Sequence, residues 1–203
     1  MQDAADTRPD PTIAPDPAAL AFLLSRRSRI AKTLAAPGPD RETLRTILTA
    51  AARSPDHGKL EPWRFIVLEG GASAAMGALT RRLGEARGLD PDRLHRAAEP
   101  FEIAPVTLCV VAAPNTAASV PEVEQILSAG AVCLAALNAA LASGWAANWL
   151  TNWMAFDREF LETGLALAPH EFVAGFLHIG TPTVAPKDRP RPDLDAKTEW
   201  REG

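Results

Sequence analysis

Three clusters of basic residues contain most of the side chains that could do chemistry in this sequence. A guanidinium group matches phosphate oxygens in a bidentate geometry, and a serine hydroxyl adds one more donor. Each cluster alone is typical of a solvated surface, but together they supply cations at three separate points. A dianionic phosphate joined to an electron-rich ring requires such an arrangement. The clusters are Arg26-Arg27-Ser28-Arg29, Arg53 with Pro55-Asp56-His57 and Lys59, and Lys187-Asp188-Arg189-Pro190-Arg191-Pro192.

Motifs that provide side-chain catalysis are missing from the sequence. There is no G-x-G-x-x-G after a predicted strand, no Walker A loop, no G-x-S-x-G and no H-E-x-x-H. The four histidines lack the spacing of metal ligands, and no hydrolase triad can be assembled. Cys109 and Cys133 lie in apolar runs and are expected to be small buried residues. If the protein is an enzyme, a cofactor therefore has to carry the chemistry.

Composition predicts one globular domain. The 203 residues are 47% hydrophobic and 23% charged, which suits a single core. A net charge of −4 disfavours a nucleic-acid binder that works by bulk charge. The most apolar run, 129–142, is shorter than the ~20 residues that span a bilayer, and the N-terminus is unlike a secretory signal. We therefore expect no nucleic-acid or membrane partner, a cytoplasmic location, a disordered leader over 1–16 and one domain over 17–203 with an extended C-terminal tail.

Periodicity and capping residues predict the elements that position the basic clusters. Strands are expected where apolar, β-branched residues are continuous, and helices where apolar residues recur every three or four positions. Pro100 is expected to lie in a loop. Helices alternating with strands indicate an α/β or α+β sandwich. The expected helices are 17–25, 40–54, 72–87, 91–98, 122–142 and 156–166, and the expected strands are 63–68, 106–112 and 171–180.

Three tryptophans recur every four residues, at Trp145, Trp149 and Trp153. On a helix this spacing forms a stripe, and core packing is the more frequent explanation of such a stripe. The asparagines beside them, Asn148 and Asn152, and the position just after Gly144 favour a place for Trp149 in the site.

The order and spacing of several segments resemble the flavin-dependent nitroreductase family, in its branch of small single-domain NAD(P)H nitroreductases. The segments are R-R-S at 26–28, A-A-R-S-P-D-H at 51–57, P-W at 62–63, the small-residue helix before Gly144, the tryptophan segment and G-F-L-H-I-G-T-P at 175–182. The resemblance implies an α+β fold, a three-layer α-β-α sandwich with a mixed, mainly antiparallel sheet. It also implies an intertwined homodimer with FMN at the subunit interface.

The resemblance also implies roles for individual residues. Contacts to the flavin are expected from Arg26, Arg27 and Ser28 of one subunit, from Arg53 and His57 of the partner, and from Trp149, Leu150 and Thr151 along the isoalloxazine. Arg189 or Arg191 is expected at the phosphate. A cation near N1 and O2 favours the anionic reduced ring, and Arg26, Arg53 and Lys59 are the candidates.

The expected activity is hydride transfer from NAD(P)H through flavin N5 to an electron-poor acceptor such as a nitroaromatic or a quinone, with ping-pong kinetics. A flavin-binding sensor or carrier without turnover is the alternative, and a flavin-destroying or dehalogenating relative ranks third. The sequence departs from the family pattern at two places, and the altered segment 149–152 motivates the alternative. Glu61 stands where the family commonly has Gln, and Leu150-Thr151 stands where it commonly has Arg-Ser. Asn148 and Asn152 are the polar side chains available to replace the missing arginine.

Overall fold

The computed structural model describes residues 14–203, so the predicted leader lies outside the described residues except for 14–16. Helix α1 (Pro17–Ser25) begins where the sequence predicted it, because the Asp16 carboxylate accepts a hydrogen bond from the Ala19 N–H at 3.0 Å. Helix α2 (Arg41–Ala51) begins in the same way, with Asp40 accepting from the Thr43 N–H at 2.8 Å.

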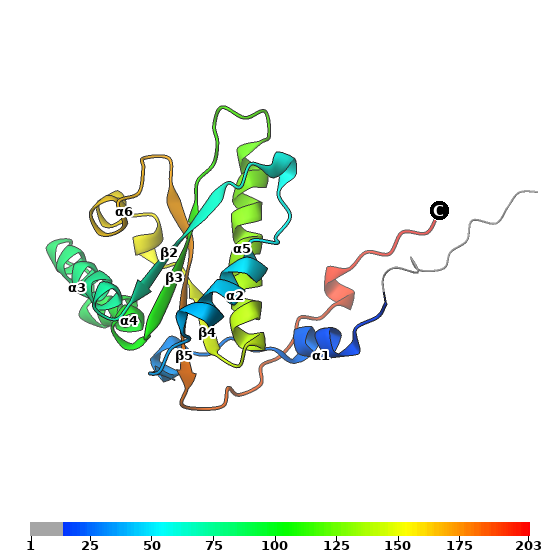
Figure 1. Cartoon of the computed structure of the whole chain (residues 1–203), viewed down its shortest axis with the longest axis horizontal. Helices are drawn as coiled ribbons and strands as arrows, with labels where there is room; N and C mark the ends of the chain where they lie inside the picture. Colours follow the sequence, from blue (N-terminus) through cyan, green and yellow to red (C-terminus); the bar gives the residue numbers. More distant parts are fainter. Residues whose placement is uncertain (1–13) are drawn as a thin grey trace, which may run out of the picture.

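The centre of the fold is a sheet in the order β2-β3-β5, and β4 and β1 both pair with β5 (Figure 1). Every pairing among the described strands is antiparallel, so the sheet lacks the mixed character that was expected. Strand β3 is buried at all seven positions, as its continuous apolar run predicted. The strands are β1 (Leu34–Ala35), β2 (Trp63–Glu69), β3 (Val106–Ala112), β4 (Ala146–Leu150) and β5 (Phe172–Pro182).

Helices cover both faces of the sheet and complete the predicted three-layer α+β sandwich (Figure 1). One face packs on α2 and α5 (Glu122–Ala142), and the other on α3 (Gly71–Ala86), α4 (Pro91–Ile103) and α6 (Arg158–Leu165). An apolar core fills each interface. The core under α4 and α6 is centred on Phe101, Phe160 and Phe176, whose rings meet edge-on or tilted at 5.0–6.2 Å between centroids.

Helix α4 continues through Pro100 to Ile103, so the expectation of a loop at Pro100 is wrong. Proline removes one hydrogen bond and crowds the preceding turn. Burial of the last turn offsets this loss, because Phe101 is 1% exposed and contacts the aromatic core.

The tryptophan segment is also not a helix. Ala146–Leu150 is strand β4, and a 3₁₀ turn follows at Trp153–Ala155. Trp149 packs toward α5, and its Nε1 donates to the carbonyl of Ala174 at 3.2 Å. A Cβ at position 175 would collide with the Trp149 indole, which explains the glycine there. Trp153 belongs to the core on the opposite face. Core packing of the three rings is thus confirmed, but on both faces of a sheet.

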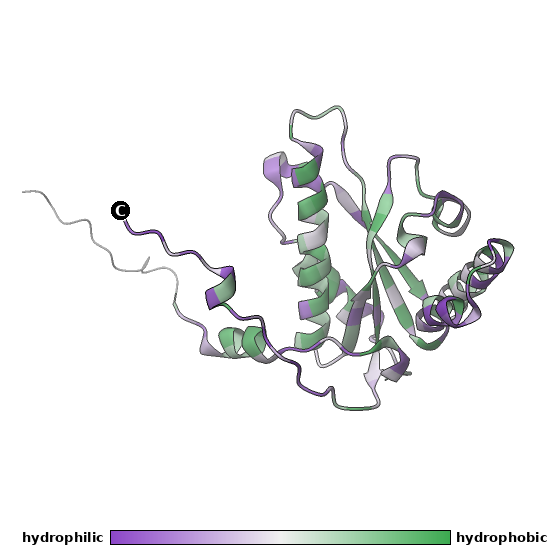
Figure 2. Ribbon diagram, turned by 180° about the vertical axis from the view of Figure 1, so that it is seen from behind, coloured by the Kyte–Doolittle hydropathy of each residue, from purple (hydrophilic) through white to green (hydrophobic). Residues whose placement is uncertain are grey.

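Helix α1 and the tail beyond β5 lie side by side and project from the body of the domain (Figures 1 and 2). Helix α1 buries none of its residues, and Leu20, Leu23 and Leu24 are all more than half exposed. Helix α5 has a second exposed apolar stripe at Val123, Leu127 and Leu134. By length and composition alone, α5 is also the one helix in residues 14–203 that could cross a membrane. Soluble core helices share that property.

An ion pair outside the cores gives the fold a pH dependence. The Arg64 guanidinium donates to both carboxylate oxygens of Glu171 at 2.7 and 2.9 Å, and the Ala168 N–H donates to the same group at 2.9 Å. Mainly through the Arg64 bonds, the pKa of Glu171 falls from 4.5 to about 2. A carboxyl with a lowered folded-state pKa stabilises the fold fully above its unfolded pKa and loses that effect as the pH falls toward the folded value.

We predict that Glu171→Gln lowers the free energy of unfolding by about 1–2 kcal/mol at neutral pH, a value reduced for the exposure of Arg64. The difference from the wild type should shrink between pH 4.5 and about 2. Denaturant titrations at several pH values would measure it. Glu162→Gln, which alters the exposed pair with Arg158, is the matched control and should change little. A pH-independent difference for Glu171→Gln would contradict the prediction.

Candidate functional site

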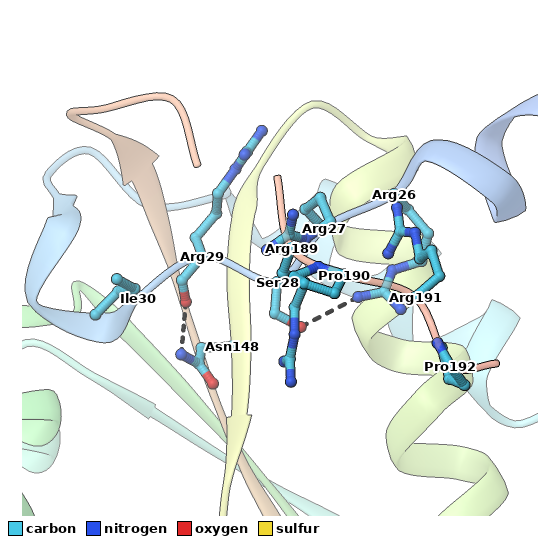
Figure 3. A pocket seen from close by; sticks show the side chains of 10 residues that line it. All are labelled: Arg26, Arg27, Ser28, Arg29, Ile30, Asn148, Arg189, Pro190, Arg191 and Pro192. Carbon is cyan, nitrogen blue, oxygen red and sulfur yellow. Dashed lines mark hydrogen bonds between the residues drawn. The ribbon is translucent and has the colours of Figure 1, made fainter. Parts of the chain in front are cut away.

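A hollow of about 770 Å³ lies where the segment after α1 passes between β4 and the tail (Figure 3). We call it the arginine hollow. It brings together two of the three basic clusters, although more than 150 residues separate them in the sequence. Its lining residues are Arg26, Arg27, Ser28, Arg29, Ile30, Asn148, Arg189, Pro190, Arg191 and Pro192. Five predicted site residues, Arg26, Arg27, Ser28, Arg189 and Arg191, are thus neighbours.

Backbone contacts to β4 fix the position of the segment after α1. The Arg29 N–H donates to the Ala147 carbonyl at 2.9 Å, and the Asn148 side chain donates to the Arg29 carbonyl at 2.5 Å. Within the segment, Arg26 Nη2 donates to the Ser28 hydroxyl at 3.1 Å. Figure 3 shows Arg26, Arg27, Arg189 and Arg191 gathered around Ser28, with Arg29 pointing away from them. The arrangement is therefore tied to the sheet.

Positive charge dominates the arginine hollow. Five arginines line it, and among residues 14–203 they form ion pairs only with Asp188, which lies 2.9 Å from Arg27 and 3.7 Å from Arg191. The pKa of Asp188 is lowered, first by the N–H of Arg189 and then by these guanidinium groups. The Nε atoms of Arg26 and Arg29 are buried without a hydrogen-bond partner in the described chain. Excess charge and unmet donors suit an anion with several oxygens, such as a phosphate.

A second cavity of about 360 Å³ follows along β4, between the end of that strand and α4. We call it the α4 cavity. Leu150 and Thr151, which are expected along the flavin ring, both line it. Trp149 contributes only from its backbone side, because its indole lies on the opposite face. The full lining is Arg96, Ala97, Pro100, Phe101, Trp149, Leu150, Thr151, Asn152, Met154, Phe176 and His178.

The pairing of β4 with β5 places the two cavities next to each other. Asn148, which lines the arginine hollow, is paired with His178, which lines the α4 cavity. Asn152 ends the segment with φ 59° and ψ −176°, a conformation that a non-glycine residue rarely adopts, and its side chain accepts from the Trp153 N–H. Strained backbone of this kind clusters at functional sites. The arginine hollow and the α4 cavity together form an elongated site along one strand.

The other basic cluster does not join this site within one chain. Arg53, His57 and Lys59 are exposed near the N-terminal end of α5, where His57 Nδ1 lies 2.7 Å from a Glu124 oxygen. The arginine hollow adjoins the other end of α5, near Gly144. A helix of 21 residues is about 30 Å long. No single small ligand can contact both clusters of one chain.

The loop that holds this cluster is conformationally strained. Gly58, Lys59 and Glu61 all have positive φ, at 75°, 53° and 47°. The Asp56 carboxylate stabilises the loop by accepting the Glu61 N–H at 2.6 Å. Side chains disfavour this region of φ by about 1–2 kcal/mol each, so the loop is held in a specific shape at an energetic cost.

Sequence reasoning missed several lining residues. Arg29 was noted in its cluster but not assigned to the site, and Asn148 was considered only as a substitute for the missing arginine. Arg96 on α4 lies in no motif, and His178 on β5 lies in the G-F-L-H-I-G-T-P segment but had no role assigned to it. Only the pairing of β4 with β5 and the packing of α4 bring them to the cavity.

Comparison with known proteins gives a consistent result. A model of the nitroreductase family matches residues 23–181. A protein of Escherichia coli K12 named "Putative NAD(P)H nitroreductase YdjA" is 34% identical over 167 residues, which cover 82% of this chain and 89% of the relative. A "Putative NAD(P)H nitroreductase" of Haemophilus influenzae is 41% identical over 113 residues, 55% of this chain and 60% of the relative.

Solved structures show the same fold. The crystal structure of a nitroreductase-like family protein from Bacillus cereus has a TM-score of 0.78 at 21% identity and covers 94% of this chain and 100% of that one. A protein from Desulfovibrio desulfuricans described as "a putative nitroreductase in complex with fmn" has a TM-score of 0.71 at 23% identity with the same coverage. From the family match over most of its length, and from the similarity to the Escherichia coli protein, this chain belongs to the nitroreductase family.

Proposed function

We propose that the protein is an FMN-dependent oxidoreductase. It passes a hydride from NAD(P)H through the flavin to an electron-poor acceptor such as a nitroaromatic or a quinone, with ping-pong kinetics. The observation that carries this proposal is the arginine hollow, which adjoins the segment 149–151 in a chain of this family. The Desulfovibrio desulfuricans relative binds FMN, and the names of the sequence relatives specify NAD(P)H.

The residues present fit FMN. Five guanidinium groups against one carboxylate leave a formal excess of four positive charges, more than enough for a phosphate dianion. The phosphate would be held by Arg26, Arg27 and Ser28 together with Arg191 or Arg189. The Nε of Arg26 is buried without an acceptor in residues 14–203, and a phosphate oxygen would supply one. The segment 149–151 would hold the ring. Bound FMN supplies reversible hydride transfer, and no side-chain acid or base is needed for that chemistry.

The chain itself then has to bind the flavin, orient its ring and shield the site from water. Tying the arginine segment to β4 fixes the phosphate relative to the strand that contacts the ring. The apolar side chains of the α4 cavity exclude water from one side of the site. Cations near the reduced ring would stabilise its negative charge, and we propose Arg26 of this chain with Arg53 and Lys59 of a second copy for that role.

Two copies of the chain are part of the proposal. Arg53, His57 and Lys59 belong to a segment that contacts the N-terminal half of α5, whereas the arginine hollow adjoins its C-terminal end, so in this proposal a second copy supplies them. The exposed apolar residues of α1 and α5 and the projecting tail provide surfaces that an intertwined homodimer would cover. Each dimer would then hold two equivalent sites.

A flavin-binding sensor or carrier without turnover is the second candidate. Leu150, half-buried in the α4 cavity, stands where the family commonly has an arginine. A site without that charge could hold flavin and fail to receive a nicotinamide nucleotide. The two candidates differ in one observable property, the reduction of bound flavin.

We predict that purified protein incubated with FMN becomes yellow and that anaerobic addition of NADH or NADPH bleaches the flavin absorbance. Riboflavin, which lacks the phosphate, measures the contribution of the arginine hollow. A colourless protein after incubation would contradict flavin binding. A yellow protein that neither nucleotide bleaches would favour the sensor or carrier.

We predict that Arg27→Ala weakens FMN binding about 10–100-fold, the contribution of a hydrogen bond to a charged group. Binding of riboflavin should change much less, because it lacks the phosphate. Quenching of flavin fluorescence gives both dissociation constants. Arg93→Ala, an exposed arginine on α4 that lines neither cavity, is the control. An equal loss for FMN and riboflavin would place Arg27 away from the phosphate.

We predict that Arg26→Ala and Arg53→Ala dimers are each impaired and that mixed subunits regain activity. In a shared site, one of the two sites of a heterodimer receives intact Arg26 and Arg53, so up to half of the wild-type activity per heterodimer should return. Unfolding and refolding the mixture together, followed by the NADPH oxidation rate, measures the recovery. Mixtures with no more activity than the separate variants would argue against sites built across an interface.

A further inference from the structure

A buried histidine lines the α4 cavity, and the proposed function gives it no role. His178 is 1% exposed, and its ring meets the Phe101 ring edge-on at 5.0 Å between centroids. It lines the cavity from β5, beneath the segment 150–152. Burial lowers the pKa of His178 to about 3, so the ring is neutral at physiological pH.

A chain of hydrogen bonds fixes which ring nitrogen carries the proton. The Ser73 hydroxyl lies 2.8 Å from the Phe101 carbonyl, which can only accept, so Ser73 donates there. The hydroxyl of Thr107, 3.0 Å from that of Ser73, must then donate to it. Thr107 Oγ1 therefore accepts from His178 Nδ1 at 3.0 Å, and the proton of the neutral ring is on Nδ1.

This tautomer leaves Nε2 as an acceptor with no hydrogen-bond partner in residues 14–203. Nε2 is not one of the fully buried polar atoms without a partner, so it is open to the cavity, where water or a ligand can pair with it. Nε2 can pair only with a donor, so a purely accepting group such as a carboxylate would leave it unpaired. The floor of the cavity therefore selects for an O–H or N–H group.

The rest of the cavity selects for a flat apolar body. Phe101, Phe176, Met154 and Leu150 supply aromatic and apolar walls, and about 360 Å³ is within the range of small-molecule pockets. Arg96 lines the cavity from the exposed side of α4 and forms no ion pair with another described residue. An arginine at the mouth suits an electron-rich oxygen pair such as a nitro group.

We propose that the α4 cavity binds the electron acceptor itself, as a planar aromatic compound with a hydroxyl or N–H donor at one end and a nitro or quinone oxygen at the other. The donor pairs with His178 Nε2, and the oxygen faces Arg96. This assignment deepens the proposed function, on which the role of the ligand as electron acceptor rests, whereas the binding itself can be measured without turnover.

The test compares two ligands that differ in one donor, 4-nitrophenol and 4-nitroanisole. Each is titrated calorimetrically into the FMN-loaded protein, in mildly acidic buffer where the phenol keeps its proton and His178 stays neutral. We expect 4-nitrophenol to bind about tenfold more tightly, the effect of one hydrogen bond to a buried acceptor. Equal affinities, or no binding once FMN is loaded, would overturn the proposal, the second because the flavin then fills the cavity.

Variants distinguish the contribution of the hydrogen bond to His178 Nε2 from that of the shape of the cavity. Thr107→Val keeps the side-chain shape but frees the tautomer of His178, so the preference for 4-nitrophenol should fall below about threefold. His178→Phe should abolish the preference, and if that variant does not fold, Thr107→Val decides. Arg96→Ala should weaken both ligands equally, because both carry the nitro group. His170→Ala, at an exposed histidine, is the control and should change neither ligand.

The outcome is independent of the proposed function. A protein that takes up FMN but shows no preference between the two ligands overturns this inference alone. A protein that binds no FMN but prefers 4-nitrophenol in its apo form supports the cavity assignment and overturns the flavin proposal. A preference that persists unchanged in Thr107→Val contradicts the fixed tautomer and therefore the proposal.

Discussion

Mutual repulsion among the guanidinium groups gathered around Ser28 is the constraint from which the site follows. Arg26 and Arg27 are held close to Arg189 and Arg191, and Asp188 alone among the described residues pairs with any of them. Contacts from Arg29 and Asn148 to β4 prevent the first segment from moving away. A bound polyanion would remove this repulsion and satisfy the unpaired Nε atoms, so ligand binding and stability of the fold are coupled.

The length of α5 makes the site depend on association. Its inner face is close-packed against α2 and the sheet, which is possible because Ala129, Ala136 and Ala140 are small and fully buried. Its two ends lie near different basic clusters, and its outer face exposes Val123, Leu127 and Leu134. The helix that keeps the clusters apart in one chain therefore also exposes a surface through which a second copy could bring them together. In such an assembly, loss of dimerisation would remove the site along with the interface.

Local signals in the sequence predicted the elements well, whereas contacts between elements decided the rest. The start of α1 and the apolar run of β3 depend on neighbouring residues alone, and they were predicted correctly. The helix through Pro100 and the strand at Trp149 depend on what packs against them, Phe176 in one case and Gly175 in the other. The network of Ser73, Thr107 and His178 joins three elements, and nothing in the sequence indicates it. The arginine clusters could be found because charged residues are visible in a sequence. A buried hydrogen-bond acceptor such as His178 Nε2 cannot be recognised from the sequence.

The alternation of side chains along β4 explains how one strand can serve two cavities. Trp149 is anchored in the core on the α5 side, so Asn148 and Leu150 must face the other way, toward the arginine hollow and the α4 cavity. In the α4 cavity the ionisable side chains are Arg96, which stays charged, and His178, which is neutral down to a pH of about 3. Neither can deliver a proton at neutral pH, since the only proton of His178 is committed to Thr107. Protons needed to complete the reduction of an acceptor in this cavity must then come from water, because the donor bound to Nε2 lies at the end of the acceptor opposite the oxygen that faces Arg96.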